Sequence, residues 1–520
     1  MRIEIMDTTL RDGEQTQGVS YSPVEKLHMA SLLLKDVKVD RIEVASARVS
    51  EGEFDAACKI TQWASQNGLL ERIEVLGFVD GDTSLDWINR AGARVVNLLC
   101  KGSRRHLEKQ LRKTPEQHIS DIKYVISKAR QMGISINIYF EDWSNGMINS
   151  EDYVIFMLDS LKDEAITRFM LPDTLGILNP DQTYTFCRKI VERYPGLHFD
   201  FHAHNDYDLA AGNVFAAIKA GVKGVHTTIN GLGERAGNAP LSSIIAIIRD
   251  HFDIECGIDE SELTRVSQVV ESYSGIRIPV NKPVVGENVF TQTSGIHADG
   301  DSKDNLYFNN LLPERFGRKR KYALGKMAGK ATIRKNLEEF GLNLSADSLS
   351  KVTQRVIELG DKKENVTTED LPFIIADVLG AEQITYRVFI KNYSLSLANG
   401  MRPSASVKIE IDGSFYEDSS SGDGQYDAFM KALRKIYEKL NRELPLLTDY
   451  LVTIPPGGKT DALVETVISW NHNGMEFRTK GLDADQTESA IKATEKMLNI
   501  IENNESGTGI RNLTGNTNEL

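Results

Sequence analysis

Eight short runs of apolar and β-branched residues alternate with amphipathic helical patterns over roughly the first 250 residues of this 520-residue chain. Proline opens three of the helical patterns, at Pro23, Pro115 and Pro180, where it favours the first helical position. Eight strand–helix units in series predict an α/β fold, the closed (β/α)8 TIM barrel. A doubly wound open sheet is the alternative, but it rarely needs so many units, and no glycine-rich phosphate loop follows the first run. The runs are 3–10, 41–45, 73–79, 95–100, 134–141, 168–174, 199–204 and 225–229.

The alternation ends after residue 262, so the sequence predicts a catalytic barrel over 1–262 and three further regions. Residues 263–380 have the pattern of a helical linker region, and they include a long polar loop of a kind that is usually functional or disordered. Residues 381–502 contain two successive β-β-β-α patterns, which predict one pseudo-symmetric α+β domain. Residues 503–520 are polar and predict a disordered tail.

Composition excludes several classes of partner. The net charge of −13 argues against nucleic acid and against a polybasic membrane contact. No apolar run approaches the roughly 20 residues of a membrane span, and no signal-peptide pattern follows Met1. The four cysteines are scattered without metal-finger spacing, which predicts reduced thiols in a cytoplasmic protein.

A metal site is predicted where the first and seventh runs end. Asp12 lies in the stretch 7–18 (Asp-Thr-Thr-Leu-Arg-Asp-Gly-Glu-Gln-Thr-Gln-Gly), directly after the first strand. His202 and His204 are two residues apart on the seventh strand, so their side chains face the same side. The C-terminal ends of barrel strands share one mouth, and this oxygen–nitrogen set suits Zn2+, Mn2+, Mg2+ or another divalent ion. Asn238, in a glycine-rich stretch after the eighth strand, could add a carbonyl ligand.

Other strand ends carry groups that suit a substrate. Arg11 could face an anionic or carbonyl group, and Thr174 could donate a hydrogen bond to a carboxylate. Glu141 could relay a proton or steady Arg11, although a glutamate or threonine at a strand end is more often structural. His297 and Tyr307, in the long polar loop, could act as acid–base groups or bind a large cosubstrate; a solvated loop histidine is the alternative.

Three motifs resemble those of the 2-isopropylmalate, homocitrate and citramalate synthases, in the family's order and within a resemblance that covers nearly the whole chain. They are Asp-Thr-Thr-Leu-Arg-Asp-Gly-Glu-Gln at 7–15, His-Ala-His-Asn-Asp at 202–206 and Gly-Glu-Arg-Ala-Gly-Asn at 233–238. The stretches 39–46, 141–146 and 454–461 look most like the citramalate-forming members with an isoleucine-regulated domain. The resemblance implies an acyltransferase that condenses acetyl-CoA with pyruvate and water to (R)-citramalate and CoA, on a threonine-independent route to isoleucine.

The resemblance also implies roles for the residues. Asp12, His202 and His204 would bind the metal, with Asn238 in or near its shell. Arg11 would stabilise the alkoxide that forms from the keto oxygen, Thr174 would hold the carboxylate, and Glu141 would handle a proton of the acetyl methyl group. His297 and Tyr307 would act on acetyl-CoA. The contacts with acetyl-CoA would come from Asp299, Asn305, Leu306 and Tyr307. A homodimer is implied, with the middle region of one subunit covering its neighbour's active site.

The choice of 2-oxo acid depends on the side chains at the ends of strands three to five. Leu76, Leu99 and Tyr139 are bulky, which favours pyruvate over a branched chain. The main alternative is a 2-isopropylmalate synthase that uses 3-methyl-2-oxobutanoate and is inhibited by leucine. No extra cation stands at these positions, which counts against 2-oxoglutarate. A hydroxymethylglutaryl-CoA lyase would carry a catalytic cysteine in the loop 231–235, and this chain has none there.

The C-terminal domain is expected to bind isoleucine as a feedback inhibitor, because helix N-termini favour an amino acid's carboxylate and citramalate leads toward isoleucine. Alternatives are a purely dimerising domain, or an amino-acid sensor whose barrel is inactive. The effector residues expected by resemblance are Tyr426, Asp427, Tyr450, Ile454, Val464 and Gln486.

Overall fold

The structure, a computed structural model, describes residues 2–252, 254, 256–339, 343–361, 366–371, 374–375, 378, 387–453 and 464–505. The chain divides into two compact units. One unit comprises Met1–Phe290 and Phe308–Arg320, and the other comprises Thr291–Tyr307 and Lys321–Leu520. The chain therefore passes from one unit to the other three times.

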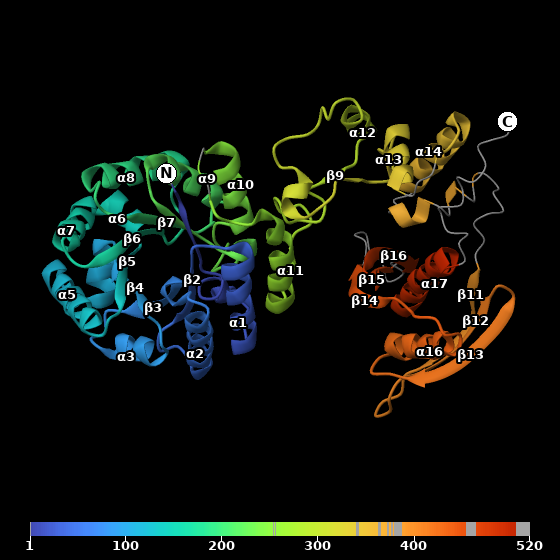
Figure 1. Cartoon of the computed structure of the whole chain (residues 1–520), viewed down its shortest axis with the longest axis horizontal. Coiled ribbons are helices and arrows are strands. Elements are labelled where there is room, and N and C mark those ends of the chain that lie inside the picture. The colour runs from blue at the N-terminus through green and yellow to red at the C-terminus, as the bar shows by residue number, and fades with distance from the viewer. Residues whose placement is uncertain are drawn as a thin grey trace. The chain divides into compact units, whose positions relative to one another are not determined.

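The first unit is built on a closed barrel of eight parallel strands (Figure 1). The first strand pairs with both the second and the eighth, which closes the sheet and leaves no edge. The predicted barrel is confirmed, and the open-sheet alternative is wrong. The strands are β1 (Glu4–Asp7), β2 (Arg41–Ser46), β3 (Ile73–Phe78), β4 (Val95–Lys101), β5 (Ser135–Glu141), β6 (Ile166–Asp173), β7 (Phe199–Ala203) and β8 (Gly224–Thr227).

Helices surround the barrel, and their starts follow from local sequence. Ser22, Thr114 and Asn179 each form a capping box immediately before the helices that begin at Pro23, Pro115 and Pro180. The helices are α1 (Pro23–Ser31), α2 (Glu51–Gln66), α3 (Thr83–Arg90), α4 (Arg104–His106), α5 (Pro115–Gln131), α6 (Trp143–Asn149), α7 (Glu151–Leu161), α8 (Pro180–Arg193), α9 (Ala210–Ala220), α10 (Leu241–His251) and α11 (Leu263–Ser274). The last of these buries Leu263, Val266 and Val270 in the core of the barrel unit, so the predicted boundary at residue 262 does not coincide with the division between the units.

The inside of the barrel is charged near the N-terminal ends of its strands. The guanidinium of Arg41 donates from Nη1 to Oε1 of Glu74 at 2.8 Å and from Nη2 to Oδ2 of Asp200 at 2.6 Å. All three side chains are buried. Burial alone would raise the pKa of Asp200, but Arg41 and the hydrogen bonds from His198 and His226 hold it well below its usual range. We call this buried group of Arg41, Glu74 and Asp200 the ionic floor of the barrel.

One segment returns to the barrel after leaving it. Within Phe308–Arg320, Arg315 donates from Nη1 to Asp250 at 2.8 Å and from Nη2 to Glu260 at 2.7 Å. The ring of Phe316 stacks on that of Phe290 at 5.8 Å. These contacts attach the segment Phe308–Arg320 to the barrel, and we call this segment the staple.

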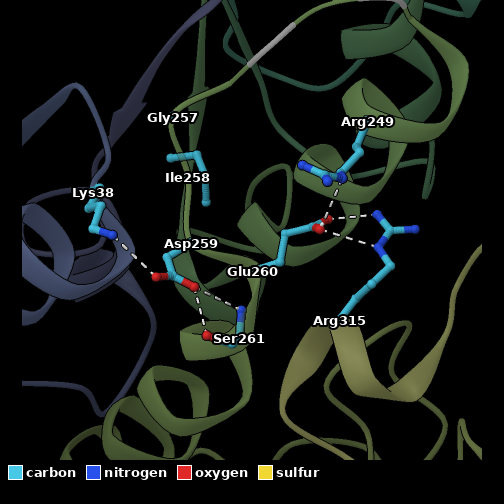
Figure 2. A pocket seen from close by; sticks show the side chains of 8 residues that line it. All are labelled: Lys38, Arg249, Gly257, Ile258, Asp259, Glu260, Ser261 and Arg315. Atoms are coloured by element: carbon cyan, nitrogen blue, oxygen red, sulfur yellow. Dashed lines mark hydrogen bonds and ion pairs between the residues drawn. The ribbon is translucent and has the colours of Figure 1, made fainter.

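A pocket of about 360 Å3 lies beside the staple (Figure 2). Lys38 directly precedes β2 and Arg249 lies in the last turn of α10, so the pocket is at the N-terminal ends of the strands, away from the mouth where barrel chemistry sits. It is lined by Lys38, Arg249, Gly257, Ile258, Asp259, Glu260, Ser261 and Arg315.

The second unit ends in two β-β-β-α repeats, as predicted. Each repeat folds as a three-stranded antiparallel sheet with one helix against it. Phe429, Trp470 and Leu498 lie in one apolar core that both repeats share. The elements are β11 (Val388–Ser396), β12 (Ser404–Ile411), β13 (Ser414–Ser421), α16 (Gln425–Lys439), β14 (Leu446–Thr453), β15 (Val464–His472), β16 (Met475–Asp483) and α17 (Gln486–Glu505).

Shorter elements precede the repeats in this unit: β9 (Thr291–Gln292), α12 (Gly295–Asp301), β10 (Lys321–Tyr322), α13 (Lys330–Glu339) and α14 (Ala346–Asp361). A separate apolar cluster holds α13 and α14 together, with Ile333, Leu337 and Val352 among its members. Among the described residues of both units, no helix has the length and apolar character needed to cross a bilayer.

Candidate active site

The turn after β1 places Arg11 and Asp12 at the mouth of the barrel. The backbone N–H groups of Arg11, Asp12 and Gly13 all point at the carbonyl oxygen of Thr8, at 2.8–3.2 Å. This tight turn carries the two charged side chains inward, where the side chain of Arg11 is 9% exposed and that of Asp12 only 3%. A short 3-10 helix, Gly13–Gln15, then leads the chain away.

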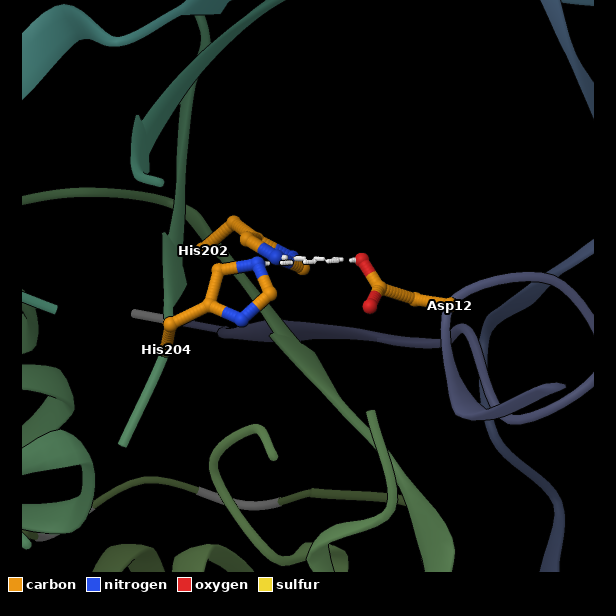
Figure 3. Close-up of side chains that lie close together, drawn as sticks. All are labelled: Asp12, His202 and His204. Carbon is orange, nitrogen blue, oxygen red and sulfur yellow. Dashed lines mark ion pairs between the residues drawn. The ribbon is translucent and has the colours of Figure 1, made fainter. Parts of the chain in front are cut away.

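Asp12, His202 and His204 come together as the sequence predicts. Oδ2 of Asp12 lies 3.4 Å from Nε2 of His202 and 4.0 Å from Nε2 of His204. Figure 3 shows both imidazole rings beside the carboxylate, and one candidate ligand atom from each residue lies within 4.8 Å of the other two. All three side chains are buried, so this is an enclosed set of one oxygen and two nitrogen donors.

The protonation of this set suits a divalent ion. Burial lowers the pKa of His202 well below its usual range and also lowers that of His204, which keeps both imidazoles neutral. Burial would raise the pKa of Asp12, but the guanidinium of Arg11 and the hydrogen bond from Asn238 hold it low, so the carboxylate stays ionised. Neutral histidine and ionised aspartate are the forms that bind metal.

Asn238 adds a fourth donor. Its side-chain nitrogen donates to Oδ1 of Asp12 at 3.0 Å and to the carbonyl oxygen of Leu232 at 3.1 Å. Its carbonyl Oδ1 is buried and has no hydrogen-bond partner within the described ranges, as a group facing an ion would. The residues therefore fit a divalent ion. The sequence identified all four of them.

Glu43, on β2, holds Arg11 and was not among the residues predicted from the sequence. Its Oε2 accepts from Nε of Arg11 at 2.5 Å and from the hydroxyl of Thr8 at 2.9 Å, while Oε1 accepts from the side chain of Asn97 at 2.8 Å. Glu43 is completely buried. The available signal was a carboxylate in the middle of an apolar strand, where only a cation or several donors can hold it.

Glu141 has a different partner from the one expected. Its carboxylate pairs with the ammonium of Lys101, which ends the neighbouring strand β4. The expectation that Glu141 steadies Arg11 is wrong, because Glu43 is the closer carboxylate. Thr174 follows β6, and its hydroxyl oxygen accepts from the backbone N–H of Asp142 at 2.9 Å, so its proton can be donated to a ligand.

A small apolar cluster lines the inside of the barrel next to Arg11. Its members are Met6, Leu76, Tyr139 and Met170, with Leu99 packed against them, and it is separate from the main core. The guanidinium carbon of Arg11 lies 5.9 Å from the centre of the Tyr139 ring. The sequence predicted Leu76, Leu99 and Tyr139 but not the two methionines.

His297 and Tyr307 belong to the second unit, where they are in contact. Their ring centres are 4.1 Å apart, and Nδ1 of His297 lies 3.1 Å from the side-chain oxygen of Gln292. Gly300 makes this possible, because a Cβ there would lie only 2.4 Å from the Tyr307 ring. Asp299 pairs with Lys303 at 2.7 Å. Asn305 and Leu306 are both exposed.

Three of the predicted effector residues lie together. The rings of Tyr426 and Tyr450 are 5.4 Å apart, and the side chain of Gln486 lies near that of Tyr450. Val464 begins β15, whereas Asp427 pairs with Lys431 at 2.7 Å and accepts from the backbone N–H of Asp423. Ile454 lies outside the described residues.

Three family models match successive parts of the chain. The HMGL-like model matches residues 2–270, the model for the homocitrate synthase post-HMGL domain matches 284–364, and the model for the LeuA allosteric (dimerisation) domain matches 365–502. Together they cover nearly the whole chain.

Relatives similar to the chain carry two kinds of name. A Methanopyrus kandleri protein, named as a candidate (R)-citramalate synthase, is 35% identical over 89% of this chain and 88% of its own length. From Methanocaldococcus jannaschii, a 2-isopropylmalate synthase is 33% identical, covering 96% and 95%, and an (R)-citramalate synthase is 30% identical, covering 97% and 100%. Identity alone therefore does not choose between the two names.

Proposed function

Because the chain belongs to the HMGL-like family and, within it, to the 2-isopropylmalate synthase family of acyl-transferring condensing enzymes, we propose that it is an (R)-citramalate synthase. The proposed reaction joins the methyl carbon of acetyl-CoA to the keto carbon of pyruvate. Water then hydrolyses the thioester, which releases CoA and (R)-citramalate.

The observation that carries the choice of pyruvate is the apolar cluster beside Arg11. Leu76, Tyr139 and Met170 are buried against one another, next to the residues that would hold the keto acid. A methyl group needs little space beside such a wall, whereas an isopropyl group would have to displace packed side chains. Rejection by bulk is worth about 10–200-fold for each added methylene-sized group.

A bound divalent ion would supply a Lewis acid for the 2-oxo acid's carbonyl and carboxylate oxygens, held by Asp12, His202, His204 and Asn238. Arg11 supplies the other positive charge. Nε of Arg11 donates a hydrogen bond to Glu43, and Nη1 donates one to Asp12 at 2.9 Å. The Nη2 group of Arg11 is left to face the keto oxygen. A guanidinium held in this way stabilises the negative charge that develops on that oxygen as the new carbon–carbon bond forms.

Proton transfer would fall to several of the residues expected from the sequence. Glu141 ends β5 beside Lys101, and its carboxylate would take part in moving a proton of the acetyl methyl group. Thr174 would donate its hydroxyl proton to the substrate carboxylate. His297 and Tyr307 form an acid–base pair that suits the acetyl-CoA end of the reaction.

Regulation is part of the proposal. The match to an allosteric (dimerisation) domain supports a homodimer whose C-terminal domain binds isoleucine. The cluster of Tyr426, Tyr450 and Gln486 lies at the start of α16 and α17, where backbone N–H groups favour an amino acid's carboxylate.

A second function, 2-isopropylmalate synthesis from 3-methyl-2-oxobutanoate, is favoured by one observation. The 2-isopropylmalate synthase of Methanocaldococcus jannaschii is slightly more similar to this chain than the (R)-citramalate synthase of the same organism.

The deciding experiment measures CoA release from acetyl-CoA with a thiol reagent, with Mn2+, Mg2+ or Zn2+ added. Pyruvate and 3-methyl-2-oxobutanoate are compared at equal concentration, and a reaction without 2-oxo acid gives the hydrolysis background. We expect kcat/KM for pyruvate to be higher by at least about 100-fold, and chiral chromatography to identify the product as (R)-citramalate. Preference for the branched acid would establish the second function instead.

A further inference from the structure

Three polar side chains form a hydrogen-bonded series across the inside of the barrel. Oδ2 of Asp200, on β7, lies 3.1 Å from Nε2 of His226, on β8. Nδ1 of His226 lies 2.8 Å from the hydroxyl oxygen of Tyr139, on β5. All three side chains are buried, so each hydrogen bond forms away from water, where losing it costs most.

The ionic floor sets the direction of the hydrogen bond between His226 and Asp200. Asp200 accepts from the permanently charged guanidinium of Arg41 at 2.6 Å, so it also accepts from His226. Nδ1, the other ring nitrogen of His226, then engages the hydroxyl group of Tyr139 at 2.8 Å. His226 thus joins the Tyr139 ring to the charged groups of the floor.

The ring of Tyr139 forms part of the apolar cluster that would limit the size of the substrate. It packs with Leu76 and Met170, and it meets the ring of His202 edge-on at 6.0 Å. A hydrogen bond at the far end of the ring restricts the two side-chain torsions that would let it swing away. The width of the apolar cluster beside Arg11 therefore depends on His226.

We propose that His226 is a positioning residue that fixes Tyr139 and thereby sets the size limit for the 2-oxo acid; this rests on the proposed function. His226 acts through Tyr139, and Asp200 and Arg41 keep it in the required orientation. Without His226 the ring can move, and a longer substituent can enter.

The test compares four variants of the full-length protein: His226→Leu, Tyr139→Phe, the double variant and His198→Leu. His198 is the matched control, because it donates to the other oxygen of Asp200 at 2.9 Å but its side chain is partly exposed to solvent. The readout is the ratio of kcat/KM for pyruvate to that for 3-methyl-2-oxobutanoate, with the metal content measured alongside.

We expect His226→Leu and Tyr139→Phe each to lower the ratio at least about tenfold, the double variant to lower it no further, and His198→Leu to leave it unchanged. Tyr139→Phe keeps the test decisive if His226→Leu does not fold, since it removes only the hydroxyl group. An unchanged ratio in either single variant, or additive effects in the double variant, would overturn the proposal.

Failure of the proposed function is separable from failure of this inference. If the wild-type protein releases CoA with neither 2-oxo acid, the proposed function is wrong. The free energies of unfolding of the same variants still decide whether His226 and Tyr139 are coupled: non-additive losses support the anchoring of Tyr139, and additive losses overturn it.

Discussion

The carboxylate of Glu43 accepts a 2.5 Å hydrogen bond from Nε of Arg11, although the two residues are 32 positions apart in the chain. The strand that carries Glu43 is adjacent to the one that leads into Arg11, so barrel closure brings them together. Glu43 also accepts from Thr8 and Asn97, which fixes the carboxylate on both oxygens. The cation at the mouth is thus oriented before any substrate arrives.

Glu43→Gln is expected to lower kcat by about 100-fold, because an amide cannot hold the guanidinium as a carboxylate does, and oriented charge at a developing oxyanion is worth about 100- to 1,000-fold. Metal content, measured by atomic emission, should not change. Glu74→Gln is the matched control, since Glu74 is a buried carboxylate paired with Arg41 on the floor. Equal losses of kcat in both variants would show that Glu43 acts only through stability.

His202→Ala is expected to abolish both turnover and metal retention while the far-ultraviolet circular dichroism remains that of the wild type. The substitution removes one of the two nitrogen donors that lie near Asp12. His198→Ala, which removes an imidazole just before the same strand, should retain metal and turnover. An active, metal-loaded His202→Ala protein would contradict the assignment of this site.

Asp7 predicts a pH dependence of stability. Burial raises its pKa from 3.8 to about 7 despite the hydrogen bond that Asp7 accepts from the backbone N–H of Thr9. In the unfolded chain Asp7 ionises near pH 4, so between about pH 4 and pH 7 the unfolded state releases a proton that the folded state keeps. The stability that Asp7 contributes at low pH is therefore lost as the pH rises through this window.

The check for Asp7 is the melting temperature of the wild type and of Asp7→Asn at pH 5 and pH 8. The melting temperature of Asp7→Asn should rise relative to that of the wild type as the pH rises. The corresponding difference in the free energy of unfolding is up to a few kcal/mol, since one pKa unit corresponds to about 1.4 kcal/mol. Other titrating groups cancel in this difference. A difference that does not vary with pH would show that Asp7 ionises alike in both states.

Arg315→Ala is expected to lower the free energy of unfolding of the barrel unit by about 2–3 kcal/mol, because it leaves the largely buried Asp250 and Glu260 without their shared cation. Limited proteolysis should then cleave more readily within residues 308–320. Lys38→Ala, in the same pocket, removes only an exposed pair with Asp259 at 3.2 Å and should cost less than about 1 kcal/mol.

Tyr450→Ala is expected to remove inhibition by isoleucine, because the Tyr450 ring contacts Tyr426 and its side chain lies near Gln486. The measurement is the ratio of rates with and without saturating isoleucine. Asp427→Asn should keep the wild-type ratio, since Asp427 pairs with Lys431 on the surface of α16. Loss of inhibition in Asp427→Asn, with inhibition retained in Tyr450→Ala, would contradict the assignment of the effector site to Tyr450 and its neighbours.

The sequence was sufficient to predict the barrel and the proximity of Asp12, His202 and His204, because both depend on the order of the strands. Strand–helix alternation gives the barrel, and the ends of parallel strands meet at one mouth, so the order of the strands alone places Asp12 and His202 together. The C-terminal repeats were also recognisable from their two successive β-β-β-α patterns, and the burial of residues along β12 alternates as expected for a strand.

Partnerships across the barrel were not predictable. Glu43 and His226 are inward-facing polar residues on apolar strands, and nothing local specifies which of the opposite strands supplies a partner. Glu141 was given the wrong partner for the same reason, because Lys101 on the adjacent strand lies closer than the turn after β1. Strand ends also shifted: the first predicted run is 3–10, whereas β1 ends at Asp7.

The staple formed by residues 308–320 limits how this protein can be rearranged. A gene cut at residue 290 would encode a barrel without Arg315 and Phe316, although both belong to its compact unit. The barrel unit is thus not formed by one continuous stretch of the chain, because residues 291–307 interrupt it. A different regulatory domain would have to be joined after residue 320, with residues 291–307 carried along as an insertion.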